Sequence, residues 1–148
     1  MHQSLRQLLL ALVLIGIVGL EIELALLNHA ESVTQWIPHV ALLVGLLVTG
    51  IIQVRPTAGG LKAFQAVMAA FLVVGALGVY LHLRGNIEFA LERDPSLSGL
   101  GLIWKALRGA TPALAPGALA QLGLLGLLYT YKHPVVAERS TSAVDNVD

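Results

Sequence analysis

Few side chains in this chain could do chemistry, and most of them lie where long apolar segments end. The chain has no cysteine, which excludes disulfides, thiol catalysis and Cys-ligated metal centres. The remaining candidates are imidazoles and carboxylates, namely Glu21, Glu23, His29, His39, His82 and Glu88. Their nitrogen and oxygen atoms suit Zn²⁺, Cu²⁺ or iron. We therefore consider these six residues as a candidate metal site, although no HExxH or Glu-x-x-His spacing supports it.

His39 and His82 are also candidates for binding a cofactor. His39 lies in the first turn of an apolar segment, where a helix dipole disfavours the charged imidazolium and keeps the ring neutral. His82 continues the stripe of Gly75 and Gly78, so we expect it to face other helices. A b-type haem held by these two histidines, or a quinone-like ligand beside them, is the narrower hypothesis. The alternative is that the histidines are interfacial anchors or hydrogen-bond partners.

Glu21 and Glu23 interrupt the first apolar segment, and a carboxylate within a span indicates a functional site. At about 100° per residue the two side chains point about 200° apart, so one helix face cannot hold both. Glu23 continues the stripe of Gly16 and Gly19, and we expect it to face a partner helix. The alternative is that both carboxylates lie near the membrane surface and reach water.

The composition indicates that these residues belong to a membrane protein. Of the 148 residues, 56% are hydrophobic and 12% are charged. Soluble domains contain about 25% charged residues, and a soluble core of this size could not bury so much apolar surface. The formal net charge of zero argues against nucleic acid as a partner and leaves the lipid bilayer.

Four apolar segments are long enough to cross a bilayer as helices, since a crossing needs about 20 residues. They predict an all-α integral membrane protein with spans at about 8–27, 36–54, 61–83 and 112–131. Residues 1–134 then form a single transmembrane bundle, and the polar tail 135–148 is predicted to be disordered. A signal peptide is the less favoured interpretation of the first segment, because no small-x-small cleavage site follows it.

A short amphipathic helix is predicted between the third and fourth spans. Asp94 and Pro95 resemble a helix start, and apolar residues then recur at helical spacing through about residue 108. We expect the segment 95–108 to lie on the membrane surface, with a re-entrant segment as the alternative. Thr111 and Pro112 similarly predict the N-cap and first residue of the fourth span.

The distribution of Lys and Arg predicts that both termini are cytoplasmic. The first loop has no basic residue, whereas Arg6, Arg55, Lys62 and Lys132 flank the other side of the spans. In this multi-pass topology the six candidate residues lie near the outer face. The third loop carries four basic residues of its own, so the margin is narrow.

No nucleotide-binding, nucleophile or phosphatase motif occurs in the chain. The first functional hypothesis is therefore that a small membrane protein binds a metal ion, haem or quinone-like ligand at the His/Glu cluster. A non-catalytic subunit of a larger membrane complex is the main alternative. A proton- or cation-handling transporter component is a further one, and it would require a homo-oligomer because four helices are few for a pore.

Overall fold

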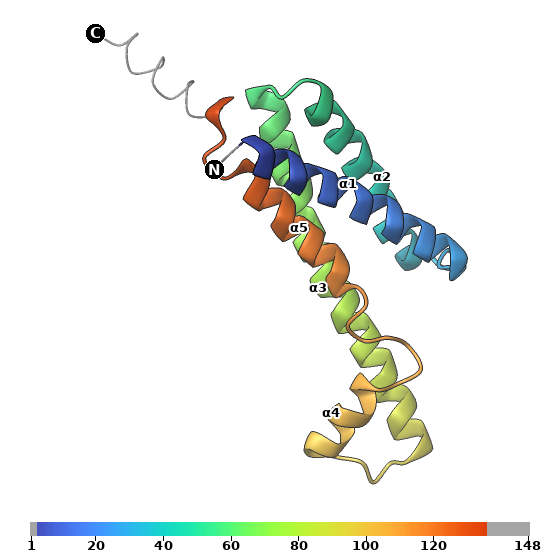
Figure 1. Cartoon of the computed structure of the whole chain (residues 1–148). Coiled ribbons are helices and arrows are strands. Elements are labelled where there is room, and N and C mark those ends of the chain that lie inside the picture. The colour runs from blue at the N-terminus through green and yellow to red at the C-terminus, as the bar shows by residue number, and fades with distance from the viewer. Residues whose placement is uncertain (1–2, 136–148) are drawn as a thin grey trace.

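The computed structural model describes residues 3–135, and all regular structure within that range is helical. The tail residues 136–148, predicted to be disordered, lie outside the described range. Five helices follow one another in the chain (Figure 1): α1 (Gln3–Leu26), α2 (Val33–Val54), α3 (Ala58–Arg93), α4 (Gly99–Leu107) and α5 (Gly117–Thr130).

Three of the helices, α1, α2 and α3, are long and apolar enough to cross a membrane. Their outward faces carry large apolar side chains such as Ile15, Leu47 and Val73, each about two-thirds exposed. Such a surface is costly in water but is well solvated by lipid tails. The structure therefore supports the prediction of a helical membrane protein.

The fourth predicted span corresponds to a shorter helix than expected. Helix α5 has 14 residues, or about 21 Å at ~1.5 Å per residue, against a hydrocarbon core of about 30 Å. The prediction that Thr111 caps this helix is wrong, because residues 113–116 form turns and Pro116 takes the N-cap position. The reason is a tertiary contact: the Thr111 N–H donates to Asn86 Oδ1 at 3.2 Å, and its carbonyl accepts from Asn86 Nδ2 at 2.6 Å.

The predicted start of the intervening helix at Asp94 and Pro95 is also wrong. Helix α3 continues to Arg93, and Asp94 is its C-cap, with its N–H donating to the carbonyl of Ala90. The Asp94 carboxylate accepts from the N–H and hydroxyl of Ser96. Helix α4 begins only after Ser98. The 36 residues of α3 extend about 54 Å, so its C-terminal part projects beyond the other helices (Figure 1).

Asn86 attaches α4 to this projecting part of α3. Its side chain is buried, and Nδ2 donates to the carbonyl of Ala106 at 2.9 Å as well as to Thr111. Close approach requires a glycine at position 109, since a Cβ there would lie 2.4 Å from Asn86 Cγ. Figure 1 shows α4 packed against the C-terminal part of α3, which it crosses at a steep angle.

Glycines allow the long helices to approach one another, as the sequence predicted. A Cβ at Gly75 would lie 2.7 Å from the backbone nitrogen of Ala120, and one at Gly123 would lie 2.5 Å from the carbonyl oxygen of Met68. Helices α3 and α5 therefore pack backbone to backbone. Gly45 on α2 similarly makes room for the ring of Phe71.

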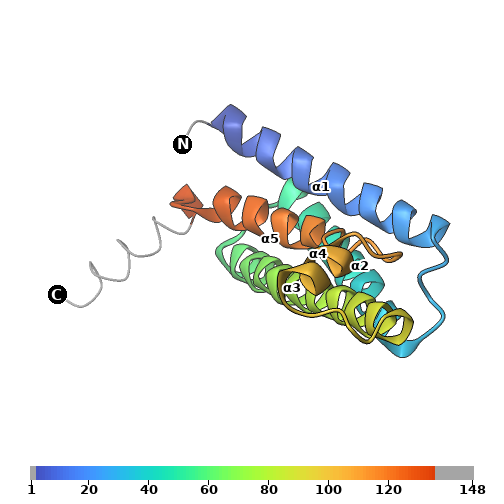
Figure 2. The same cartoon turned by 90° about the horizontal axis from the view of Figure 1, so that it is seen from below.

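The helices close into a ring, in which α3 contacts α2 and α5, and α1 contacts the same two helices (Figure 2). All four helices contribute to the core of the ring, and its largest fully buried side chains are Phe64 and Phe71 of α3. Gln65 Nε2 adds a hydrogen bond from α3 to Thr130 Oγ1 of α5 at 3.1 Å. The ring positions four helices around a common interior.

Arg6 joins the first helix to the end of the last. Its side chain is only 7% exposed, and its guanidinium donates to the carbonyls of Tyr129, Tyr131 and Lys132. The last carbonyls of a helix have no intrahelical partner, and a cation at that end also interacts favourably with the helix dipole. Arg6 therefore caps α5 from a position more than 120 residues away in the chain.

We expect Arg6→Ala to lower the free energy of unfolding by roughly 2 kcal/mol, because hydrogen bonds to charged groups contribute about 1.5–3 kcal/mol. The free energy of unfolding of Arg6→Lys should lie between those of Arg6→Ala and the parent, because one ammonium cannot reproduce the planar fork of the guanidinium. Thermal or SDS-induced unfolding in detergent measures this. The control is Arg55→Ala at an exposed arginine, and equal stability of the Arg6 and Arg55 variants would contradict the capping role.

Candidate functional site

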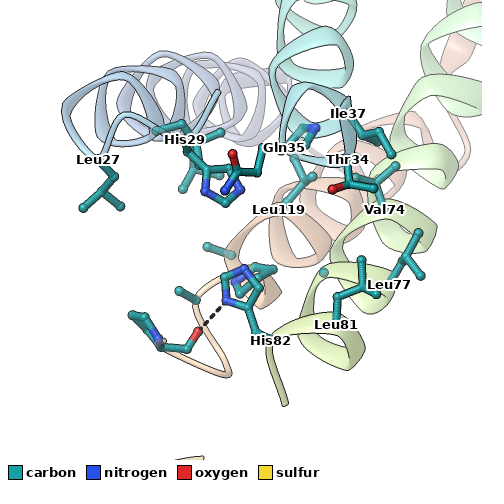
Figure 3. A pocket seen from close by; sticks show the side chains of 18 of the residues that line it. Leu27, His29, Thr34, Gln35, Ile37, Val74, Leu77, Leu81, His82 and Leu119 are labelled. Carbon is teal, nitrogen blue, oxygen red and sulfur yellow. Dashed lines mark hydrogen bonds between the residues drawn. The ribbon is translucent and has the colours of Figure 1, made fainter. Parts of the chain in front are cut away.

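A cleft of about 680 Å³ lies between the C-terminal part of α1, the N-terminal part of α2, the middle of α3 and the segment that leads into α5. Its walls are mostly apolar, with Leu20, Leu77, Leu81 and Leu119 among them. Polar side chains also border it, including Glu23, His29, Gln35 and His82 (Figure 3). Clefts of 300–1,000 Å³ with apolar walls and a few polar groups are typical of small-molecule sites.

His82 is held in a defined orientation at the edge of the cleft. Its Nδ1 lies 3.1 Å from the carbonyl oxygen of Pro112 (Figure 3). A carbonyl can only accept, so Nδ1 must carry the proton. In the neutral ring Nε2 is then an unprotonated acceptor. The turn at residues 112–116, which displaces the start of α5, thereby also fixes the tautomer of His82.

His29 lies on the opposite side from His82, and the two ring centroids are 6.2 Å apart. His29 belongs to the loop between α1 and α2. Burial lowers the pKa of the His29 imidazole below its ordinary value, and the nearby rings of His82 and His39 lower it further. Burial therefore favours the neutral form of His29, whose ring faces that of His82 across the cleft.

His39 is turned away from the cleft and fixes the loop that carries His29. It is only 6% exposed. Its Nε2 donates to the backbone carbonyl of His29 at 2.9 Å, and its Nδ1 lies 2.8 Å from Glu21 Oε1. Both ring nitrogens are thus occupied. Because Nε2 must carry a proton, a second proton lies between Nδ1 and Glu21, and the pair has no net charge in either arrangement of that proton.

The sequence predicted that Glu23 faces a partner helix, but in the structure Glu21 does so instead. Glu21 contacts α2, whereas Glu23 is exposed and borders the cleft. The reason is that α1 diverges from α5 along the glycine stripe. A Cβ at Gly16 would collide with Leu122, but one at Gly19 would meet nothing within 4 Å. One turn further, Glu23 has no helix opposite it and faces open space.

Glu88 lies apart from the other five candidate residues. It accepts a hydrogen bond from Arg84 Nε at 2.8 Å on the projecting part of α3, and both side chains are about 60% exposed. Exposed pairs of this kind contribute little to stability. Of the six residues, the structure brings Glu23, His29 and His82 to the cleft, pairs Glu21 with His39, and leaves Glu88 on the surface.

Within residues 3–135 no three His, Asp or Glu side chains are placed so that they could hold one metal ion. A haem between His39 and His82 would require a free nitrogen on each ring, whereas both nitrogens of His39 are hydrogen-bonded. The metal and haem hypotheses therefore lack ligand geometry in this part of the chain. The third form of the hypothesis, a quinone-like ligand, needs only a cleft and a polar group.

Two residues of the site were missed in the sequence. Gln35 borders the cleft, and its Oε1 accepts from the N–H groups of Glu31 and Ser32. The Ser-x-x-Gln spacing of a capping box was a visible signal for this arrangement. Pro112 contributes a backbone carbonyl, and a backbone group gives no signal in the sequence.

No family model, curated protein or solved structure matches this chain. The geometry of the cleft is therefore the structural basis for a proposed function.

We expect His82→Gln to raise the pKa of His29 toward its ordinary value, because the variant removes one of the neighbouring charges that lower it. The pKa should stay below the ordinary value, since burial is the larger cause. NMR titration of ¹⁵N-histidine-labelled protein measures both values. Glu88→Gln, at an exposed carboxylate away from the cleft, is the control. An unchanged His29 titration in His82→Gln would show that the two rings do not interact.

Proposed function

We propose that this protein binds a lipophilic, quinone-like ligand in the cleft between α1, α2, α3 and the start of α5. The observation that carries the proposal is the cleft itself: about 680 Å³ of mostly apolar space, bordered by the imidazoles of His29 and His82. An apolar ring or tail would pack against the leucines. A polar head would reach the imidazoles, which fix its orientation.

The location of the cleft suits a ligand that is dissolved in lipid. Its walls come from helices that are long and apolar enough to cross a membrane, and leucines such as Leu77 and Leu81 are about 40% exposed within it. Such side chains gain little from contact with water but pack well against a hydrocarbon ligand. The cleft is therefore suited to a hydrophobic molecule that enters from the bilayer.

We further propose four membrane crossings, with both termini in the cytoplasm. The hydrogen bonds from Arg6 to the end of α5 support an even number of crossings, because they hold the start of α1 and the end of α5 at one end of the molecule. Residues 112–116 would extend the short helix α5 to the width of a bilayer. Arg6, Arg55, Lys62 and Lys132 all flank that end, as the positive-inside rule requires of the cytoplasmic side.

Helix α4 would then lie on the outer side, where its composition suits the membrane surface. Leu100, Ile103 and Trp104 are exposed, and Lys105 and Arg108 accompany them. Apolar residues beside basic ones are typical of helices that bind at the lipid headgroups. Helix α4 would thus be the surface helix expected at residues 95–108, with the shorter bounds Gly99–Leu107.

Single cysteines test this topology, because the chain has none of its own. We expect a membrane-impermeant maleimide to label Gly101→Cys in intact cells and Gly59→Cys only after permeabilisation. Neither position has an atom within 4 Å of an added Cβ, so both should tolerate the change. Leu100→Cys, on the apolar face of α4, should react more slowly than Gly101→Cys if that face rests on lipid. Equal labelling of positions 59 and 101 in intact cells would contradict four crossings.

Ligand binding is tested by filling the cleft with a larger side chain. Leu77→Trp should weaken the binding of decylubiquinol to the protein in nanodiscs by about tenfold or more, corresponding to ~1.4 kcal/mol. Leu77 borders the cleft and is 43% exposed, so the replacement does not require the core to expand. Titration of tryptophan fluorescence or calorimetry measures the dissociation constant.

The matched control is Val73→Trp, one turn earlier on the same helix, where the side chain is exposed and does not border the cleft. We expect it to bind decylubiquinol as the parent does. Absence of binding by the parent, or equal binding by the parent and Leu77→Trp, would reject the proposal. Either result would favour the accessory-subunit alternative.

A further inference from the structure

We propose that the head group seated against His82 is an aromatic hydroxyl, as in a phenol or quinol, which donates a hydrogen bond to Nε2 of His82. This inference rests on the proposed function and names the chemical class of its ligand. It follows from the tautomer that the fold imposes on His82 and from the space beside that ring.

The tautomer follows from the contact with Pro112. The carbonyl of Pro112 accepts from Nδ1, so the one proton of the neutral ring is committed there. Figure 3 shows the ring of His82 turned into the cleft, with the hydrogen bond to Pro112 on one side and His29 across the gap. The group offered to a ligand is the lone pair of Nε2. A hydroxyl can donate to it, whereas a quinone carbonyl or an ether has no proton to give.

The surroundings of His82 leave room for a flat ring. Gly85 follows His82 by one turn on the cleft side of α3, whereas Pro116 fills the space above Gly78 one turn earlier. A Cβ at Gly85 would meet nothing within 4 Å, so this side of the helix is open. Leu81 and Leu119 supply apolar surface nearby. An aromatic ring can therefore lie along α3 while its hydroxyl reaches His82.

The other ionisable groups at this end are compatible with a hydroxyl donor. Glu23 carries only acceptor atoms when it is ionised, and each neutral imidazole has one acceptor nitrogen. A carbonyl oxygen placed against Nε2 of His82 would face a lone pair. A ligand that covers this acceptor without donating to it leaves the nitrogen unpaired, which discriminates between ligands of the same shape.

A pair of ligands that differ only in this proton tests the inference. 4-Nonylphenol and its methyl ether, 4-nonylanisole, have similar shape and lipophilicity, but only the phenol can donate. Calorimetry with the full-length protein in nanodiscs at neutral pH gives both dissociation constants. We expect the phenol to bind about tenfold or more tightly than the ether. In His82→Phe the two should bind alike, with the affinity for the ether unchanged from the parent.

The control is His133→Phe, a histidine at the other end of the bundle beside Tyr129, which should keep the preference for the phenol. Equal binding of phenol and ether by the parent would overturn the inference and leave the proposed function standing. Absence of binding of both would reject the proposed function. Unchanged preference in His82→Phe would place the acceptor elsewhere and also overturn the inference.

A measurement on the parent alone guards against a variant that fails to fold. In ¹⁵N-histidine-labelled protein, the resonance of the unprotonated Nε2 of His82 should shift on addition of 4-nonylphenol and stay in place with 4-nonylanisole. A protonated Nε2 in the ligand-free protein at neutral pH would refute the tautomer on which the inference depends. An Nε2 resonance of His82 that does not respond to 4-nonylphenol would likewise overturn the inference.

Discussion

The closed ring of helices depends on the hydrogen bonds that the guanidinium of Arg6 donates to the end of α5. A helix that ends inside an apolar molecule leaves carbonyls that must find a donor, and α5 ends in this way at Thr130. Arg6 supplies those donors from the first turns of α1. The contact joins the end of α5 to the start of α1 and so closes the ring, whose other side is the backbone contact between α3 and α5.

Two further polar side chains donate hydrogen bonds to backbone carbonyls at the opposite end of the bundle. Asn86 satisfies the carbonyls of Ala106 and Thr111, and His39 satisfies the carbonyl of His29. Each fixes a segment that would otherwise be an unconstrained loop. As a result, the turn at Pro112 and the loop at His29 are held on opposite sides of a gap. The cleft exists because these segments are attached to α3 and α2 rather than to each other.

This arrangement connects stability to the proposed function. His39 uses both of its ring nitrogens in holding the loop at His29, which is why His39 is not offered to a ligand. His82 also anchors a backbone carbonyl, but it uses only one of its two nitrogens. The atom that remains is an acceptor by necessity. The same hydrogen bond that positions the turn before α5 therefore selects the chemistry of the head group.

The sequence by itself determined the helical membrane character, the positions of the long helices and the glycines at which they meet. Those features follow from local properties: apolar length, helix-breaking residues and small side chains at helical spacing. The tertiary structure decided the end of α3 at Arg93, the late start of α5 and the pairing of Glu21 with His39. It also decided which candidates reach the cleft, since Glu23 does so only because α1 diverges from α5. These outcomes depend on hydrogen bonds between residues 18 to 30 positions apart, such as those of His39, Asn86 and His82. The capping pattern at Thr111 was overridden because the buried Asn86 side chain takes the partner that the fold brings to it, whereas Asp94 bonds to its neighbour Ser96.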